Sequence, residues 1–343
     1  MGAFLVHIKP KGPFHLGSDI GYEETEEYIH SDTLFSAIVN SYGMIYDVNE
    51  ILPDIPFRIT SAFPYVNDVY FLPTPADFDL AKICESKENK EYKKIKFVSH
   101  DLFEAITNDK IDKSQIPLKE TKESSKPKTI QERYLPSHKM LDEILKYYEL
   151  KDINKLYFTR KTDTPRVTID RCSMASDVYH YADVYYNKNV GLYFVMKVEK
   201  KEYENRLKAA IRLLGDEGIG GDRSSGKGLF EVSFSDEIKF NVEPSKNGMN
   251  VTLSLVYPKR EEVKLLSNSV FELTSRRGWV YSLWHKTLRR KTVRMITEGS
   301  VLQNGICGDI VDVSPSENGK RISTHPVYRY GYAFCVRRRL NEK

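Results

Sequence analysis

A glycine-rich run at residues 218–228 limits most strongly what this chain can fold into. It reads Gly-Ile-Gly-Gly-Asp-Arg-Ser-Ser-Gly-Lys-Gly, with five glycines in eleven positions. Glycine permits backbone conformations that other residues avoid, and successive N–H groups in such turns form concave anion sites. Arg223, Lys227 and two serines add charged and hydroxyl donors. We therefore expect a loop that binds a phosphate backbone; the alternative is a flexible loop without a ligand.

The segments on either side of this run place it between a helix and a strand. Apolar residues at 207–214 follow helical spacing, and we expect that helix to stop at Gly215. Residues 229–234 (LFEVSF) alternate as a strand does. The run matches seven positions of the nucleotide-binding P-loop, but Gly228 stands where that motif needs Ser or Thr. A P-loop also leads from strand to helix, so an NTPase is disfavoured. Glu231 replaces a stacking aromatic of the RNA-recognition signature, so base stacking across an open sheet is not predicted.

The order of the expected elements indicates an α+β fold. An apolar strand at 4–8 precedes a helix that begins near Ser31, a favoured N-cap residue. Pro- and aromatic-rich segments around 53–75 suggest further strands, and another apolar strand follows at 191–198. With the helix and strand around the glycine-rich run, the order is the βαββαβ split unit of ferredoxin-like folds. We expect this first domain to span 1–240 and a second, less regular α+β domain to span 241–343. Residues at about 80–160 contain Lys/Glu/Ser-rich tracts and predict a surface insertion with flexible parts.

Charge is distributed unevenly along a chain whose formal net charge is only +4. Residues 276–294 contain seven Lys or Arg and no acid, interleaved with Trp279, Tyr281 and Trp284. Such clustering suits counterion-release binding to a phosphate chain, and aromatic faces stack on unpaired bases. A solvated surface is the alternative for the charges, and core packing is the favoured interpretation of the two tryptophans.

Other site classes find little support in the sequence. The four cysteines form no CxxC pair, so neither a zinc site nor a disulfide framework is predicted. No apolar stretch approaches the length of a membrane span, and the N-terminus reads as a strand, not a signal peptide. We expect a soluble, cytoplasmic protein with no metal, cofactor or membrane contact.

Four parts of the sequence carry a family resemblance. The helix, the GxGGDRSSGKG loop and the strand that follows resemble the hallmark of the RAMP superfamily of CRISPR-associated proteins. Three further stretches resemble, in order, three regions of the family of fourth subunits of the Csm complex, type III-A. They are KPKGPFHLGSDIG with IHSDTLFSAI, then TPRVTIDRCSMASDVYHYADVYY, and last RRGWVYSLWHKTLRRKTVRMITEGSVL with HPVYRYGYAF. Residues 80–150 match no motif of that family.

The resemblance implies a non-catalytic RNA-binding subunit that serves antiviral defence. Such proteins pack two ferredoxin-like (RRM-like) domains, here with the second degenerate, and hold the repeat-derived 5′ handle of the crRNA. Their partners are the large polymerase-like subunit and the backbone RAMP subunit. The implied RNA-binding residues are Lys9, Lys11, His15, His30, Ser31, Asp32, Arg166, Arg171, Gly218, Gly220, Gly221, Asp222, Arg223, Ser224, Ser225, Gly226, Lys227, Gly228, Arg276, Arg277, Arg290 and Arg294.

Two of these groups have competing interpretations. Asp32 in the first turn of a helix would repel phosphate, so we expect it to accept a hydrogen bond from a ribose hydroxyl or a base amine; a helix cap without a ligand is the alternative. Arg166 and Arg171 lie in an expected hairpin arm, where they would contact phosphates or pair with Asp170.

A metal-independent endoribonuclease that processes precursor crRNA is the alternative function. His15, His30 and Tyr28 have side chains suited to general acid–base work, and they lie near the expected RNA path. The central and C-terminal motifs favour the handle-binding subunit instead.

Overall fold

The computed structural model describes residues 2–18, 21–84, 90–120, 125–280 and 288–339. It is a mixed α+β protein, rich in sheet and with few helices. Its main sheet has the order β10-β7-β6-β5-β13-β1-β14, with β4 also paired to β13. These strands are β1 (Ala3–Pro10), β4 (Phe57–Ile59), β5 (Phe63–Val66), β6 (Val69–Pro73), β7 (Phe97–Ser99), β10 (Tyr134–Leu135), β13 (Val190–Val198) and β14 (Phe230–Ser235).

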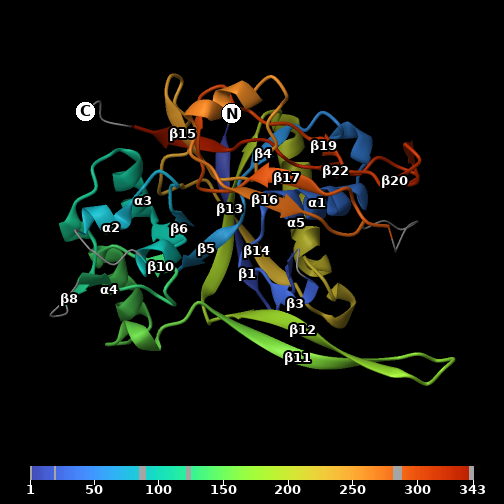
Figure 1. The fold of residues 1–343 in the computed structure, drawn as a ribbon, viewed down its shortest axis with the longest axis horizontal. Coiled ribbons are helices and arrows are strands. Elements are labelled where there is room, and N and C mark those ends of the chain that lie inside the picture. Colours follow the sequence, from blue (N-terminus) through green and yellow to red (C-terminus); the bar gives the residue numbers. More distant parts are fainter. Residues whose placement is uncertain (1, 19–20, 85–89, 121–124, 281–287, 340–343) are drawn as a thin grey trace.

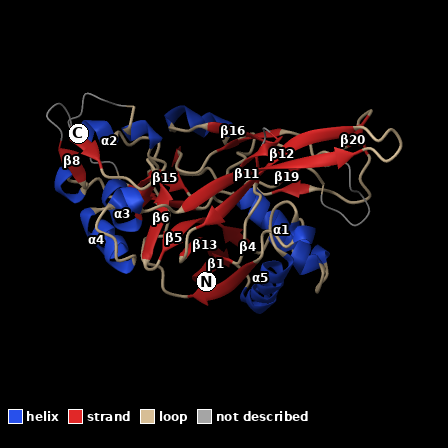
Figure 2. Cartoon of the chain, turned by 90° about the horizontal axis from the view of Figure 1, so that it is seen from below, coloured by secondary structure: helices blue, strands red, loops and turns tan. Residues whose placement is uncertain are grey.

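Two long helices cover one face of this sheet. Helices α1 (Ser31–Gly43) and α5 (Glu204–Glu217) lie side by side against β1, β13 and β14 (Figures 1 and 2). Val6 and Ile8 of β1 point into the core beneath the helices, whereas Leu5 belongs to the core on the opposite face. This alternation is what the period of two in a β-strand requires.

The predicted helix starts and stops were nearly correct. Helix α1 begins at Ser31, but His30 and not Ser31 occupies the N-cap position. Helix α5 continues past Gly215 to Glu217 and ends at Gly218. Gly215 is instead a packing position, because a Cβ there would lie 2.7 Å from the carbonyl oxygen of Phe230.

Residues 80–160 do not form the surface insertion that their composition predicted. Strands β7 and β10 extend the main sheet, and α3 (His100–Thr107) and α4 (His138–Tyr147) bury apolar side chains such as Phe103 against it. Part of each Lys/Glu-rich tract lies outside the described residues. Small elements complete the segment: α2 (Leu80–Ile83), β8 (Leu118–Glu120) and β9 (Ser125–Pro127).

A long hairpin projects from the body of the molecule. It consists of β11 (Thr159–Ile169) and β12 (Ser176–Tyr186), paired in full register, and its tip extends beyond the rest of the chain (Figure 1). The hairpin arm that the sequence predicted around Arg166 is confirmed. The short strands β2 (Gly17–Ser18) and β3 (Gly21–Thr25) lie next to its base.

The C-terminal part packs onto the free face of the main sheet. Val251 and Val336 share a core with Leu5, and no α-helix follows α5 in the described residues. The expected domain division near residue 240 stays a prediction. The strands are β15 (Met249–Thr252), β16 (Leu273–Arg276), β17 (Val293–Ile296), β18 (Val301–Gln303), β19 (Val311–Asp312), β20 (Ser316–Glu317), β21 (Lys320–Arg321), β22 (Tyr328–Arg329) and β23 (Cys335–Arg338). No helix of the described chain is long and apolar enough to cross a membrane.

Candidate nucleic-acid interface

Most glycines of the glycine-rich loop allow the loop to pack closely against the protein itself. The N–H of Ile219 donates to the carbonyl of Gly228 at 3.0 Å, and a Cβ on Gly228 would lie 2.1 Å from the oxygen of Ile219. The N–H of Gly221 donates to the carbonyl of His15, and a Cβ on Gly220 would lie 2.3 Å from that oxygen. The sequence interpretation had assigned this close approach to a ligand.

The tip of the loop is the part that faces solvent. Arg223–Ser225 form one 3₁₀ turn, in which Ser224, Ser225 and the following Gly226 are exposed. Gly226 has φ of +79°, and a Cβ added to it would meet nothing within 4 Å. Arg223 is half-buried and Gly218 ends α5. The tip therefore presents two hydroxyls and open backbone to solvent.

Lys227 does not have the role that the sequence predicted. It is 9% exposed, and its ammonium donates to both carboxylate oxygens of Asp183 at 2.8 and 2.7 Å. It also lies 3.4 Å from the carboxylate of Asp222. Because both acids belong to the protein itself, Lys227 fastens the loop to β12 and is not offered to phosphate.

Arg166 makes a second link between the hairpin and the loop. Its guanidinium pairs with Asp222 at 2.6 Å, and not with Asp170, the acid named in the competing interpretation. Asp170 instead accepts hydrogen bonds from the hairpin turn, where Arg171 is exposed. The ring of Tyr181 lies beneath both cations, 4.3 Å from Arg166 and 4.5 Å from Lys227.

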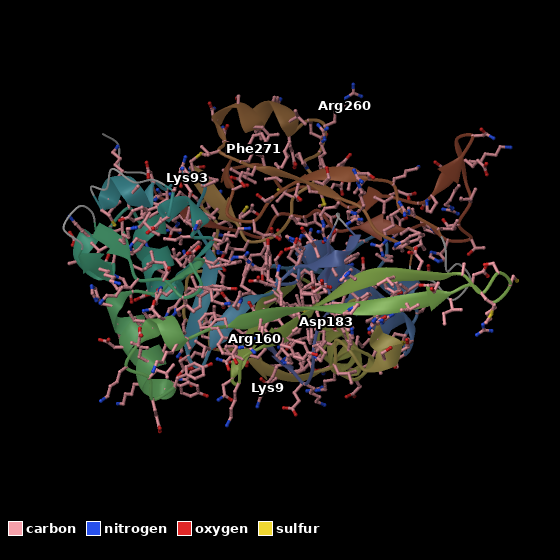
Figure 3. The ribbon with its side chains drawn as sticks, turned by 60° about the horizontal axis from the view of Figure 1, so that its bottom comes forward. Lys9, Lys93, Arg160, Asp183, Arg260 and Phe271 are labelled. Carbon is pink, nitrogen blue, oxygen red and sulfur yellow. The ribbon has the colours of Figure 1, made fainter. Side chains whose placement is uncertain are left out.

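The segment before β2 brings one buried histidine and two exposed lysines to the same region. His15 is 4% exposed, its Nδ1 lies 2.6 Å from the carbonyl oxygen of Ala182, and its ring contacts Tyr181. Lys9 and Lys11 are exposed, and Gly12 approaches the backbone of Gly226. Lys9 and Asp183 are labelled in Figure 3.

The C-terminal part of the chain covers the N-terminal end of α1. Asp32 is 0% exposed, and its carboxylate accepts from the Nε and Nη2 of Arg276 at 3.0 and 2.9 Å and from Arg329. Burial alone would raise the pKa of Asp32, but the two arginines hold it well below its usual range. Ser31 is also buried, and its hydroxyl accepts from the N–H of Leu255. The predicted contact of Asp32 with ribose or base is therefore wrong.

His30 belongs to a second buried polar cluster, close to Asp32. Its Nδ1 lies 2.8 Å from Glu298, which also accepts from the hydroxyl of Ser61. Burial opposes ionisation of Glu298, but His30 and Ser61 nevertheless lower its pKa. Sequence reasoning missed Glu298, Asp183 and Arg329. Arg329 stands among the aromatic residues of HPVYRYGYAF, and an arginine that is buried there must be paired, but this position does not indicate which acid is the partner.

The basic run divides into interior and surface residues. Arg276 is buried, and burial together with the charge of Arg329 lowers the pKa of Arg290 to about 10. Arg277 and Arg294 are exposed. Trp279 is 47% exposed beneath Arg289, so the favoured core-packing interpretation of Trp279 is wrong. Tyr281, Trp284 and Lys286 lie outside the described residues.

The predicted residues thus form two groups. The first surrounds the glycine-rich loop and the hairpin base; the second surrounds α1 and the C-terminal strands (Figure 1). Arg171 belongs to neither group, because it lies in the turn at the tip of the hairpin. Among the described residues, no three His, Cys, Asp or Glu side chains are arranged to hold a metal ion.

Comparison with known proteins identifies the family. The model of the RAMP superfamily matches residues 7–231, which include the glycine-rich loop and the hairpin. The chain belongs to the RAMP superfamily. Residues 245–337 of this RAMP protein match the CRISPR Csm4 C-terminal domain. It is 28% identical to the Csm4 protein of Methanocaldococcus jannaschii, over 92% of this chain and 89% of the relative. It is 27% identical to that of Thermococcus onnurineus, over 96% and 94%.

Solved structures share the fold of this RAMP protein. A chain in the crystal structure of the Csm3–Csm4 subcomplex of the type III-A CRISPR-Cas interference complex has a TM-score of 0.70 at 23% identity, covering 97% of this chain and 98% of that one. A chain in the crystal structure of a Csm1–Csm4 cassette in complex with cA4 has a TM-score of 0.58 at 24% identity, covering 99% and 100%. The resemblance to the fourth Csm subunit is confirmed.

Proposed function

We propose that this RAMP protein is the RNA-binding subunit of a cytoplasmic type III-A effector complex that holds the 5′ handle of the crRNA without cleaving it. The names of its relatives support a place in a Csm complex. Its structural neighbours occur with Csm3 and with Csm1, which supports a backbone RAMP subunit and the large subunit as partners. The strand order β14-β1-β13-β5, with two helices on one face, supports a ferredoxin-like first domain. A degenerate second such domain is part of the proposal.

One observation carries this proposal: the exposed tip of the glycine-rich loop is held in place by buried and half-buried charges. Lys227, Asp183, Asp222 and Arg166 fix the loop against the hairpin, so the tip presents its hydroxyls and backbone in one arrangement. Lys11 adds a cation from the neighbouring segment. Backbone and hydroxyl donors position an RNA chain, and lysine supplies the salt-dependent affinity.

We expect Lys11→Ala plus Arg223→Ala to weaken binding of a handle-bearing crRNA by about tenfold, on the usual scale of two lost phosphate contacts. The slope of log affinity against log salt should fall by about 1.4 for the two contacts. Fluorescence anisotropy at several salt concentrations, with a handle-less RNA of equal length, measures both quantities. Lys93→Ala plus Lys96→Ala serves as control, because both lysines are exposed in the distant 80–160 segment. Equal losses in the two double variants would refute a role for the loop.

The endoribonuclease alternative has less support from the described geometry. His15 bonds to the carbonyl of Ala182, and His30 is 8% exposed and paired with Glu298. Burial and the neighbouring Glu298 raise the pKa of Tyr28 well above its usual value, which does not suit a base. We expect no new product from labelled precursor RNA in EDTA or with Mn²⁺. A discrete product at the repeat boundary, lost in His15→Ala, would replace the binding proposal by the nuclease.

A further inference from the structure

A carboxylate stands at the centre of the proposed RNA site. Oδ2 of Asp222 lies 2.6 Å from Nη1 of Arg166 and 3.4 Å from the ammonium of Lys227. Both cations lie over the ring of Tyr181. This oxygen therefore marks a position for an anion between the hairpin and the glycine-rich loop. An acid on an RNA-binding surface opposes binding, because it repels phosphate.

The two cations beside Asp222 are held differently. Lys227 donates two hydrogen bonds to Asp183, and both side chains are buried. Arg166 and Asp222 are more open, with 29% and 23% of their side-chain surface exposed. Within the described chain, Oδ2 of Asp222 accepts no aligned hydrogen bond, although Arg166 lies close to it. An ion pair without hydrogen-bond alignment is the weaker kind. The Lys227–Asp183 pair is thus an anchor, and the Arg166–Asp222 pair is the one that an incoming anion reaches.

The backbone of Asp222 allows its charge to be tested alone. The residue has φ of +56° and ψ of 28°, in the left-handed region. Asparagine and aspartate adopt this conformation more readily than other non-glycine residues do. Asp222 precedes the turn Arg223–Ser225, but its side chain does not cap that turn. Asp222→Asn therefore keeps the backbone and the size of the side chain, and removes the charge.

We propose that Asp222 occupies the position of an RNA phosphate: its carboxylate pairs with Arg166 in the RNA-free protein, and a phosphate of the bound RNA displaces it. A guanidinium binds phosphate with the same N–H groups that it offers to a carboxylate. The Lys227–Asp183 anchor keeps the loop in place during the exchange. Because any RNA must displace the carboxylate, Asp222 lowers the affinity for RNA in general, and strong binding requires further contacts at the loop tip. This role rests on the proposed function, since it requires RNA at the loop.

The test compares Asp222→Asn with the wild type in the full-length chain. Fluorescence anisotropy at several salt concentrations gives the affinities for handle-bearing crRNA and for a handle-less RNA of equal length. We expect Asp222→Asn to bind both RNAs about fivefold more tightly, and the slope of log affinity against log salt to steepen by about 0.7 for the added phosphate contact. The gain should be equal for the two RNAs, because a phosphate contact carries no sequence information.

Two further variants assign the gain to Arg166. Asp163→Asn is the matched control, because it removes the same charge from the same hairpin, where Asp163 pairs with His180 at 2.8 Å. We expect it to change RNA affinity by less than about twofold, since a distant charge is screened by salt. In the Arg166→Ala background, Asp222→Asn should give no gain, because the carboxylate acts through this guanidinium. Thermal unfolding shows whether each variant stays folded.

Several outcomes would overturn the role of Asp222. Unchanged or weaker RNA binding in Asp222→Asn would make the carboxylate a structural contact or a ligand of the RNA. An equal gain in Asp163→Asn, or a gain that persists without Arg166, would reduce the effect to net charge. A gain confined to handle-bearing RNA would indicate a base contact. The proposed function fails in a different way, through equal wild-type affinity for the two RNAs, and a uniform gain in Asp222→Asn would still be measurable then. If neither protein bound either RNA, both proposals would be wrong.

Discussion

Asp32→Asn is expected to lower the free energy of unfolding by about 3–5 kcal/mol, the usual cost of removing one partner from a buried ion pair. The carboxylate directly contacts both Arg276 and Arg329, and Arg290 lies close enough for its pKa to respond to all three. Asparagine leaves these guanidiniums buried without this counter-charge. Urea unfolding followed by circular dichroism measures the loss.

Asp54→Asn is the matched control for this experiment. Asp54 pairs with Lys200 at 3.3 Å, but its side chain is 90% exposed. An exposed pair contributes about 0–1 kcal/mol. If both variants unfolded at the same urea concentration, the contacts of Asp32 would not hold α1 to the C-terminal part of the chain.

The same carboxylate predicts a dependence of stability on pH. Burial raises the pKa of Asp32, but the charges of Arg276 and Arg329 together lower it by a larger amount. The pKa in the folded state therefore lies below the ordinary value of about 3.9. A lowered pKa contributes stability that is present above the ordinary value and is lost as pH falls through the folded one. Between about pH 5 and pH 3, the stability of Asp32→Asn should therefore fall less steeply than that of the wild type. Equal slopes would contradict the assignment.

Asp32 also shows where sequence reasoning reached its limit. The periodic apolar stripe of α1 placed the residue correctly at a helix start, because local spacing is sufficient for that. Its partner Arg329 is 297 positions away, and no local pattern indicates such a contact. Lys227 is a second example. The glycine-rich loop was predicted, but the pairing of Lys227 with Asp183, 44 positions earlier, was not. Local elements were thus predictable, whereas the occupants of buried charge pairs were not.

Residues 80–160 show a different limit. Their composition is polar because several exposed stretches are Lys/Glu-rich, and this hid short buried segments such as those around Phe103 and Tyr134. Short strands with two or three residues leave almost no periodicity to detect. Sheet extension by β7 and β10 became visible only in the pairing of the strands.

Gly220→Ala is expected to disrupt the glycine-rich loop and to weaken handle-RNA binding by at least tenfold. Gly220 has φ of +95°, where an L side chain is strained by roughly 1–2 kcal/mol. A Cβ would also lie 2.3 Å from the carbonyl oxygen of His15, and this backbone cannot move without shifting the bond from Gly221 to that oxygen. Anisotropy with handle RNA measures the binding, and thermal unfolding shows whether the rest of the chain stays folded.

Gly226→Ala separates backbone strain from the clash. Gly226 has a similar φ of +79°, but an added Cβ meets nothing within 4 Å. The variant therefore carries the strain alone, and we expect it to weaken RNA binding only a few-fold. Equal, large losses in both alanine variants would mean that the left-handed conformation of the tip decides affinity. Wild-type binding in both would show that RNA does not depend on this loop, and the proposal that the loop holds the crRNA handle would then be wrong.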